Sequence, residues 1–294
     1  HEVGKRLVSH PKIAATGYTG SRGAGLVLKE AADKAGKPVY MELSSINPVY
    51  VLPGALKERG EEIVGEFVTS CLMGTGQFCT NPGVVIHEKG DVGDAFKTAY
   101  AELMSQAPAS AMLHSGIRDA YGEGVTARSG STNVEVLTDA GEGRGTGGCE
   151  ASTSVFATDA RSYLADASLA DEVFGPSTLL VGCEDREEML EIAGGLEGQL
   201  TASIFGEPEE LAEHQDLVDV LETKVGRLLF NQFPTGVEVC HSMVHGGPYP
   251  ATTDGRSTSV GTGAILRFAR PVCYQGFPDK HLPDELRDKN PLGI

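Results

Sequence analysis

The chain has 294 residues, of which 40% are apolar and 22% are charged, and 41 acidic against 24 basic residues give it a formal net charge of −17. This composition is typical of a globular protein with one or two domains. The acidic balance disfavours nucleic acid as a partner, because phosphate binding needs a basic surface. The sequence shows no apolar run long enough to cross a bilayer and no signal peptide, so we expect no membrane partner and a cytoplasmic location.

The first part of the chain has the order strand, helix, strand. Residues 12–20 and 37–45 are strand candidates, and residues 21–36 have the apolar spacing of a helix. The turn TGSRGAG at 19–25 resembles a phosphate-binding turn between strand and helix, although its glycines do not form GxGxxG. This order predicts a parallel sheet of the α/β class.

Helices and strands are expected to alternate through the rest of the chain. We predict helices at 55–73, 93–106, 185–196 and 207–223, and strands at 83–88, 151–159, 177–185, 199–206 and 225–231. Residues 115–148, rich in Gly, Ser and Thr, are expected to be loops with short elements, and 231–254 a loop. The pattern predicts an α/β protein with two subdomains.

Cys79 is the first candidate for chemistry. It lies in GTGQFCTNPG at 74–83, just past the expected end of a helix, whereas Cys71 lies within the helix as a buried structural cysteine usually does. The glycines let the backbone approach a ligand, and a backbone N–H beside the thiol is suited to bind a developing oxyanion. Spacing alone supports a nucleophile and a small buried residue about equally.

Three further residues have both a chemical and a plainer interpretation. Glu42 ends an apolar strand, where a carboxylate can serve as a general base, although a solvent-facing glutamate is the commoner case. Glu172 and Phe174 precede a Gly-Pro pair and a strand. They could hold a ribose and flank a ring, or simply form the entry to the strand.

His245 precedes two glycines in the loop and could lie near the thiol, although a structural or solvated histidine is commoner. The six cysteines are dispersed without a CxxC pair, which is typical of a reducing compartment. A metal site built from Cys240, His241 and His245 lacks the paired spacing of a structural zinc site. We therefore expect no metal.

Five segments in a fixed order resemble the aldehyde dehydrogenase superfamily. They are TGS at 19–21, MELSSINPV at 41–49, GTGQFCT at 74–80, EVFGP at 172–176 and GRLLFNQFPTG at 226–236. The resemblance implies an α/β fold with a parallel-sheet catalytic domain, a partial Rossmann-like cofactor domain and a small oligomerisation element. It also implies a homodimer or homotetramer.

The resemblance assigns roles residue by residue. Cys79 matches the nucleophile that attacks an aldehyde to give a thiohemiacetal and then a thioester, and Glu42 matches the base whose activated water hydrolyses that thioester. The resemblance is strongest to one branch of the family, and a neighbouring branch acts on long-chain aldehydes with NADP. In these branches a histidine corresponding to His245 is implied to assist the thiol. The cofactor implied is NADP or NAD, and the positions matching its contacts are Gly20, Ser21, Leu43, Glu172 and Phe174.

Two segments differ from the commoner motifs of the family, and these differences point to one of its branches. ELSS replaces ELGG, and GQFCTNPG replaces a cysteine segment followed by arginine. Both look like the branch that oxidises 2,5-dioxopentanoate (2-oxoglutarate semialdehyde), so we expect this small-molecule aldehyde as substrate. An anionic oxo-acid favours an arginine near the thiol, and the candidates are Arg118, Arg227 and Arg256.

The family's first cofactor-binding strands precede the point at which this sequence opens. We therefore expect a chain truncated at its N-terminus, which is inactive alone or completed by a missing segment. The expected domains are a cofactor-domain remnant at 1–45, a catalytic thiol domain at 46–235, and a return to the cofactor domain with the oligomerisation segment at 236–294.

Two alternatives remain open. Cys79, His245 and Glu42 could form a cofactor-independent cysteine hydrolase or acyltransferase, which would hydrolyse esters without a nicotinamide. The chain could also be a non-catalytic fragment, which would show neither cofactor binding nor selective thiol reactivity. Cofactor binding separates the dehydrogenase from both.

Overall fold

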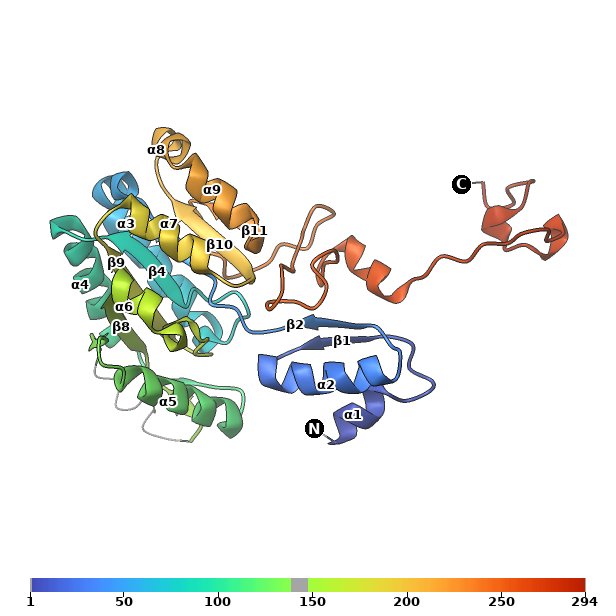
Figure 1. Ribbon diagram of the computed structural model, residues 1–294, viewed down its shortest axis with the longest axis horizontal. Helices are drawn as coiled ribbons and strands as arrows, with labels where there is room; N and C mark the ends of the chain where they lie inside the picture. Colours follow the sequence, from blue (N-terminus) through green and yellow to red (C-terminus); the bar gives the residue numbers. More distant parts are fainter. Residues whose placement is uncertain (1, 139–147, 294) are drawn as a thin grey trace.

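A large, mostly parallel sheet forms the body of the protein in the computed structural model, which describes residues 2–138 and 148–293 (Figure 1). Within these residues the sheet has seven strands in the order β11-β10-β3-β4-β9-β8-β6, and only β6 runs antiparallel to its neighbour. The strands are β3 (Val49–Val51), β4 (Val84–Glu88), β6 (Glu135–Val136), β8 (Ser154–Asp159), β9 (Ser177–Cys183), β10 (Gln199–Phe205) and β11 (Val225–Phe230).

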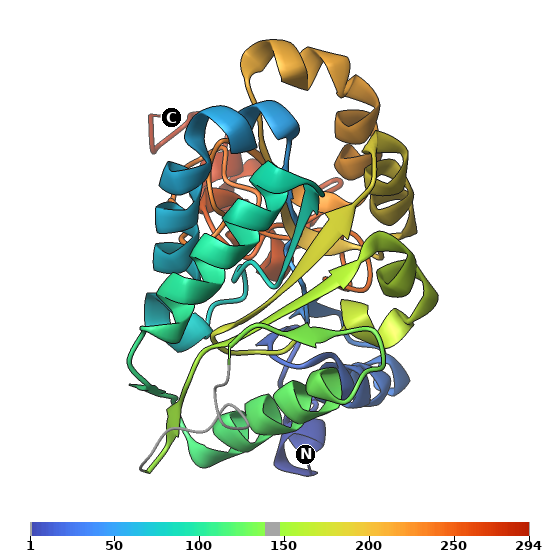
Figure 2. The same ribbon diagram turned by 90° about the vertical axis from the view of Figure 1, so that its left-hand side faces the viewer.

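Helices cover both faces of this sheet (Figure 2). One face carries α3 (Pro53–Leu72) and α4 (Asp91–Ser105), and the other face carries α5 (Ser115–Ser129), α6 (Ala160–Ala165), α7 (Arg186–Gly195) and α9 (Gln215–Glu222), with α8 (Pro208–Glu213) at one end. Because both faces are covered, every residue of β9 and β10 is buried. Their near-continuous apolar runs are the sequence signature of such central parallel strands.

Aromatic rings fix α3 against its surroundings. The Phe67 ring stacks on that of Tyr100 from α4, with centroids 3.9 Å apart, and on that of Phe233 from the loop after β11, at 5.2 Å. Gly74 follows the helix with a φ of 56°, the left-handed conformation that commonly ends a helix. The chain then turns through a 3₁₀ segment, Met73–Gly76, toward Cys79.

The N-terminal residues form a smaller unit beside the sheet (Figure 1). It comprises α1 (Glu2–Val8), β1 (Thr16–Thr19), α2 (Arg22–Lys34) and β2 (Val39–Glu42), and β1 and β2 pair in parallel as a separate two-stranded sheet. Gly25 allows α2 to pack closely, because a Cβ there would lie 2.4 Å from the Leu43 side chain. The end of β2 is thereby fixed next to the start of α2.

The predicted elements are confirmed in most places, and the differences have physical causes. Residues 115–148 were expected to be loops, yet α5 forms there because Tyr121 packs into the core and its hydroxyl donates to Ser152 O at 2.8 Å. The single helix predicted at 207–223 is wrong, because His214 leaves helical geometry and separates α8 from α9. The short strand β3 was missed; part of the 115–148 prediction, residues 139–147, lies outside the described residues.

The predicted loop at 231–254 is confirmed, since no helix or strand is described in that range. Beyond it, a 3₁₀ segment (Thr262–Phe268) leads to an extended tail that runs away from the body (Figure 1). Two short strands, β5 (Ser110–Ala111) and β7 (Glu150–Ala151), pair antiparallel. In the parts of the chain that are described, no helix combines the length and apolar character needed to cross a membrane.

Candidate active site

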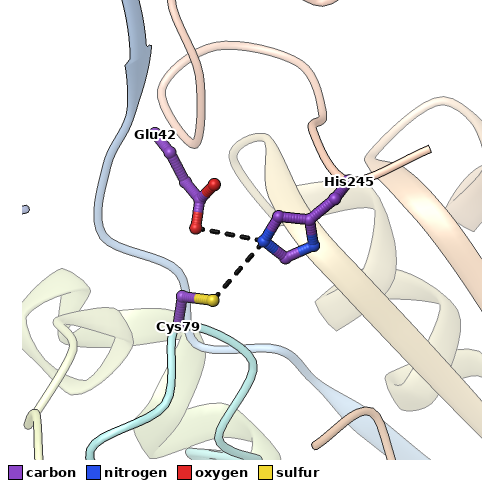
Figure 3. A group of neighbouring side chains, drawn as sticks. All are labelled: Glu42, Cys79 and His245. Carbon is purple, nitrogen blue, oxygen red and sulfur yellow. Dashed lines mark hydrogen bonds and ion pairs between the residues drawn. The ribbon is translucent and has the colours of Figure 1, made fainter. Parts of the chain in front are cut away.

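Three side chains from distant segments meet beside the large sheet (Figure 3). His245 Nε2 lies 3.4 Å from Cys79 Sγ and 3.1 Å from Glu42 Oε1. Glu42 and His245 are buried, with 5% and 3% of their surface exposed, and Cys79 is partly buried. We call these three residues the thiol cluster; all three were candidate site residues from the sequence, and one alternative drawn from the sequence grouped them together.

The loop after β11 fixes Glu42 and His245 together. The Ser259 hydroxyl donates to Glu42 Oε2 at 2.9 Å, which leaves Oε1 facing His245. The backbone N–H of His245 donates to Thr258 Oγ1 at 2.8 Å. The backbone N–H of Ser259 donates to the His245 carbonyl, also at 2.8 Å. The imidazole position is therefore set by the backbone as well as by its ring contacts.

Cys79 is held through its backbone by Asn47. The Asn47 amide donates to the carbonyls of Cys79 and Asn81 at 2.9 and 3.0 Å, and its oxygen accepts from the Thr201 hydroxyl at 3.0 Å. Asn47 is fully buried and has a φ of 47°, a left-handed conformation that asparagine tolerates better than most residues. Asn47, which lies between β2 and β3, thus anchors the segment that carries the thiol.

The electrostatics of the thiol cluster keep the thiol protonated and the carboxylate ionised near neutral pH. Burial, followed by the negative charge of Glu42, raises the pKa of Cys79 to about 12. Burial also tends to raise the pKa of Glu42, but hydrogen bonds from His245, Cys79 and Ser259 outweigh it and lower that pKa below its ordinary value. Glu42 is therefore ionised, which is the form that can accept a proton.

A cleft of about 780 Å³ is lined by Arg22, Ser44 and Glu172 among others. Ser44 lies two positions after Glu42, and the charge of Glu172 acts on Cys79. Burial raises the pKa of Glu172 to about 7, against the opposing effect of hydrogen bonds with the Ser44 hydroxyl and the Ser45 backbone. Arg22 forms an ion pair with Glu197 at 2.9 Å on the same wall. The cleft thus combines a cation, hydroxyl groups and a carboxyl group that is readily protonated.

The remaining residues predicted as cofactor contacts lie around this cleft and the thiol cluster. Gly20 N donates to the Glu42 carbonyl at 3.1 Å, and Ser21 caps the start of α2 without using its side chain for the cap. Leu43 is buried against α2, and Phe174 lines a small cavity next to Glu172. The start of α2 therefore directs backbone N–H groups, which suit an anionic group, toward the region of Ser44.

Sequence reasoning missed Asn47 and Ser259. Asn47 precedes Pro48, and an Asn-Pro pair is a turn signal, but the signal says nothing of the side chain's reach to a segment 32 positions away. Ser259 lies 217 positions from the Glu42 carboxylate it contacts. Contacts of this range are set by the fold, so a single sequence does not reveal them.

Replacing Asn47 with glycine is expected to lower the free energy of unfolding by about 1–3 kcal/mol, because two buried carbonyls lose their donor. Glycine accepts the positive φ, so the variant isolates the lost hydrogen bonds. We also expect a changed rate of Cys79 alkylation, measured by mass spectrometry. Thr201→Val is the control, since it removes a contact to Asn47 but none to the thiol segment. Equal alkylation rates in Asn47→Gly, Thr201→Val and the unmodified protein would contradict the anchoring role.

Comparison with known proteins shows which family and which relatives the chain resembles. The sequence profile of the aldehyde dehydrogenase family matches residues 1–258. The chain is 46% identical over 294 residues to alpha-ketoglutaric semialdehyde dehydrogenase 2 of Azospirillum brasilense, and 42% identical over 295 residues to alpha-ketoglutaric semialdehyde dehydrogenase of Acinetobacter baylyi. Each match covers 99% of this chain and 56% of the relative, so the chain spans about half the length of the curated relatives it matches.

Solved structures show the same fold at low sequence identity. A betaine aldehyde dehydrogenase of Staphylococcus aureus matches with a TM-score of 0.76 and 17% identity, over 91% of this chain and 52% of that chain. Lactaldehyde dehydrogenase of Escherichia coli matches with a TM-score of 0.74 and 21% identity, over 90% of this chain and 54% of that chain. Another crystal structure of the Staphylococcus aureus enzyme contains NAD⁺.

Proposed function

We propose, because the chain belongs to the aldehyde dehydrogenase family, that it oxidises an aldehyde to a carboxylic acid with NAD or NADP as the hydride acceptor. The observation that carries this proposal is the convergence of Cys79, His245 and Glu42 from three distant segments. It supplies a nucleophile and a base within reach of one carbonyl carbon.

The proposed reaction uses the thiol cluster twice. Cys79 Sγ attacks the aldehyde carbon, and its proton passes to Glu42, directly or through His245 Nε2. After oxidation of the thiohemiacetal to a thioester, Glu42 releases the thiol proton to solvent and is a carboxylate again. It then accepts a proton from water, which attacks the thioester and releases the acid together with the Cys79 sulfur. The Cys79 backbone N–H serves as one donor to the oxyanion.

The residues around the cleft and the thiol cluster suit a dinucleotide. The N-terminal turn of α2, with Gly20 and Ser21, would hold phosphate oxygens, and Glu172 would hold a ribose. Leu43 and Phe174 would flank the nicotinamide ring. When bound, the nicotinamide supplies the hydride acceptor, and the chain's own task is to hold it facing Cys79.

The proposed substrate is 2,5-dioxopentanoate, which is alpha-ketoglutaric semialdehyde, and the product is 2-oxoglutarate. The names of the two relatives with the highest quoted identity support it. Arg227 supports it as well, because its charge interacts with Cys79, whereas Arg118 pairs with Asp119 and Arg256 is exposed. In the described residues Arg227 Nη2 donates to the Pro234 carbonyl at 2.7 Å and Nε is buried without a hydrogen-bond partner, so the support that Arg227 gives is its positive charge and not a free donor.

Three proposals concern the wider protein. Residues 1–45 form a part of the cofactor domain, 46–235 the catalytic thiol domain, and 236–294 the return to the cofactor domain with the oligomerisation segment. The assembly is a homodimer or homotetramer, by analogy with the family. It acts in the cytoplasm, since all six cysteines are free.

The test is the reduction of NAD or NADP by the protein with 2,5-dioxopentanoate, measured by nicotinamide absorbance. Pentanal is the matched neutral aldehyde, and we expect its kcat/KM to be at least about 100-fold lower, because it lacks the groups that pair with the site. Ester hydrolysis without cofactor reduction would instead favour the cysteine hydrolase. A protein that binds neither cofactor would favour the non-catalytic fragment.

A further inference from the structure

The thiol cluster also gathers the donor types of a metal site. One carboxylate oxygen, one sulfur and one ring nitrogen lie within 4.8 Å of one another, and no other group of three such residues does so in the described part of the chain. Thiolate, imidazole and carboxylate are the side-chain ligands that zinc binds in proteins. The arrangement therefore raises the question of whether the three atoms can share one ion.

The spacing fits the edges of a tetrahedral zinc site. Bonds of about 2.0–2.1 Å to nitrogen and oxygen and about 2.3 Å to sulfur separate tetrahedral ligands by about 3.3 Å for N and O and about 3.6 Å for N and S. The observed separations from His245 Nε2 are 3.1 Å to Glu42 Oε1 and 3.4 Å to Cys79 Sγ. A widening of about 0.2 Å along these two edges matches the tetrahedral spacing, and the third edge, between the Glu42 oxygen and Cys79 Sγ, is at most 4.8 Å. The fourth position is left for water.

The surrounding groups orient the three ligands but do not complete a structural site. Ser259 holds the second oxygen of Glu42, as outer-shell groups commonly do for ligating carboxylates. His245 Nδ1 is buried and has no hydrogen-bond partner within residues 2–138 and 148–293. A metal on Nε2 would leave the Nδ1 proton without the acceptor that ligating histidines usually have. We therefore expect reversible binding, weaker than in a structural site.

We propose that the thiol cluster binds one Zn²⁺ ion through Cys79 Sγ, His245 Nε2 and Glu42 Oε1, and that the bound ion reversibly blocks the thiol. Binding replaces the thiol proton by the metal, so the sulfur lone pair is no longer free to attack a carbonyl. The binding itself is independent of the reaction, whereas its inhibitory consequence rests on the proposed function.

This inference departs from the expectation that no metal binds, and it uses a different set of residues from the one weighed in the sequence. Cys240 Sγ contacts Ser242 at 3.4 Å, and His241 Nδ1 contacts Thr262 at 3.0 Å. Neither side chain belongs to the group of potential metal ligands formed by Glu42, Cys79 and His245. Cys240 and His241 therefore serve as controls for adventitious binding by a cysteine next to a histidine.

The test is a titration of the protein with Zn²⁺ alone, in competition with a chromophoric chelator. We expect one equivalent of Zn²⁺ to bind per chain, reversibly, in the unmodified protein and in Cys240→Ser. Cys79→Ser and His245→Gln should weaken this binding at least about tenfold, because loss of a ligand costs no less than loss of an outer-shell partner. Co²⁺ in place of Zn²⁺ should give a thiolate charge-transfer band that Cys79→Ser lacks. Glu42→Gln serves if His245→Gln fails to fold, as judged by circular dichroism.

A second readout follows Cys79 alkylation by iodoacetamide, which Zn²⁺ should slow and a chelator should restore. Unchanged zinc affinity in Cys79→Ser and His245→Gln, loss of binding in Cys240→Ser, or no binding to the unmodified protein would each overturn the proposal. None of these results depends on aldehyde oxidation. Failure of the zinc site therefore leaves the dehydrogenase proposal intact, and an inactive protein that binds zinc through Cys79 leaves this one intact.

Discussion

Cys79→Ala is expected to lower kcat/KM for aldehyde oxidation by at least about 10⁵-fold, the scale seen when a catalytic nucleophile is removed. Cys79 is the cysteine whose thiol lies next to both the His245 ring and the Glu42 carboxylate. Without the Cys79 thiol no thiohemiacetal forms, so the carbon that would donate the hydride is never generated. The measurement is the steady-state reduction of NAD or NADP over a series of aldehyde concentrations that extends below KM.

Cys71→Ala is the matched control for that experiment. Cys71 lies in α3, is fully buried, and contacts the Thr178 hydroxyl at 3.2 Å rather than the thiol cluster. Its replacement should cost stability while leaving kcat within a few-fold of the unmodified value. Substantial turnover by Cys79→Ala would rule out the proposed mechanism.

Glu42→Gln is expected to have two opposite effects. Turnover should fall by about 10²–10⁴-fold, because the thioester loses the base that activates water. Alkylation of Cys79 should become faster at about pH 8, because the Glu42 charge contributes to the raised pKa of the thiol. Removing it lowers that pKa, and each unit raises the thiolate fraction tenfold at a pH below the pKa.

Iodoacetamide labelling across a pH series, read by mass spectrometry, measures the second effect. Glu172→Gln is the control, since the Glu172 charge also raises the pKa of Cys79 but contributes less than Glu42 does. We expect a smaller acceleration in that variant. Slower labelling in Glu42→Gln than in the unmodified protein would show that Glu42 activates the thiol more than its charge suppresses it.

The sequence predicted the parts of the fold that have regular patterns. Buried parallel strands such as β9 and β10 are continuous apolar runs, and α3 has a clear apolar face that ends at Gly74. α5 was missed because its three internal glycines weaken helix propensity, and its stability comes from packing around Tyr121. β3 was missed because three residues after a proline are too few to show a period.

The candidate site was predictable in its members but not in its geometry. Cys79 follows the end of α3 and Glu42 is the last residue of β2, positions where a functional residue is plausible, and the family motifs support both. Nothing local indicates that His245 contacts both of them, or that Asn47 anchors the thiol segment. Such contacts depend on how the loop after β11 packs against the end of β2, as at the bridge between Glu42 and Thr252.

The wide sequence separation within the thiol cluster has a consequence for biosynthesis. Glu42 and His245 are 203 positions apart, and Cys79 and His245 are 166 apart, so closing these loops is a late and entropically costly event in folding. Until then Cys79 behaves as an ordinary thiol with a pKa of about 8.5, more ionised at neutral pH than in the native protein. The newly made chain is thus most vulnerable to oxidants before it finishes folding, and the completed fold protects its own nucleophile.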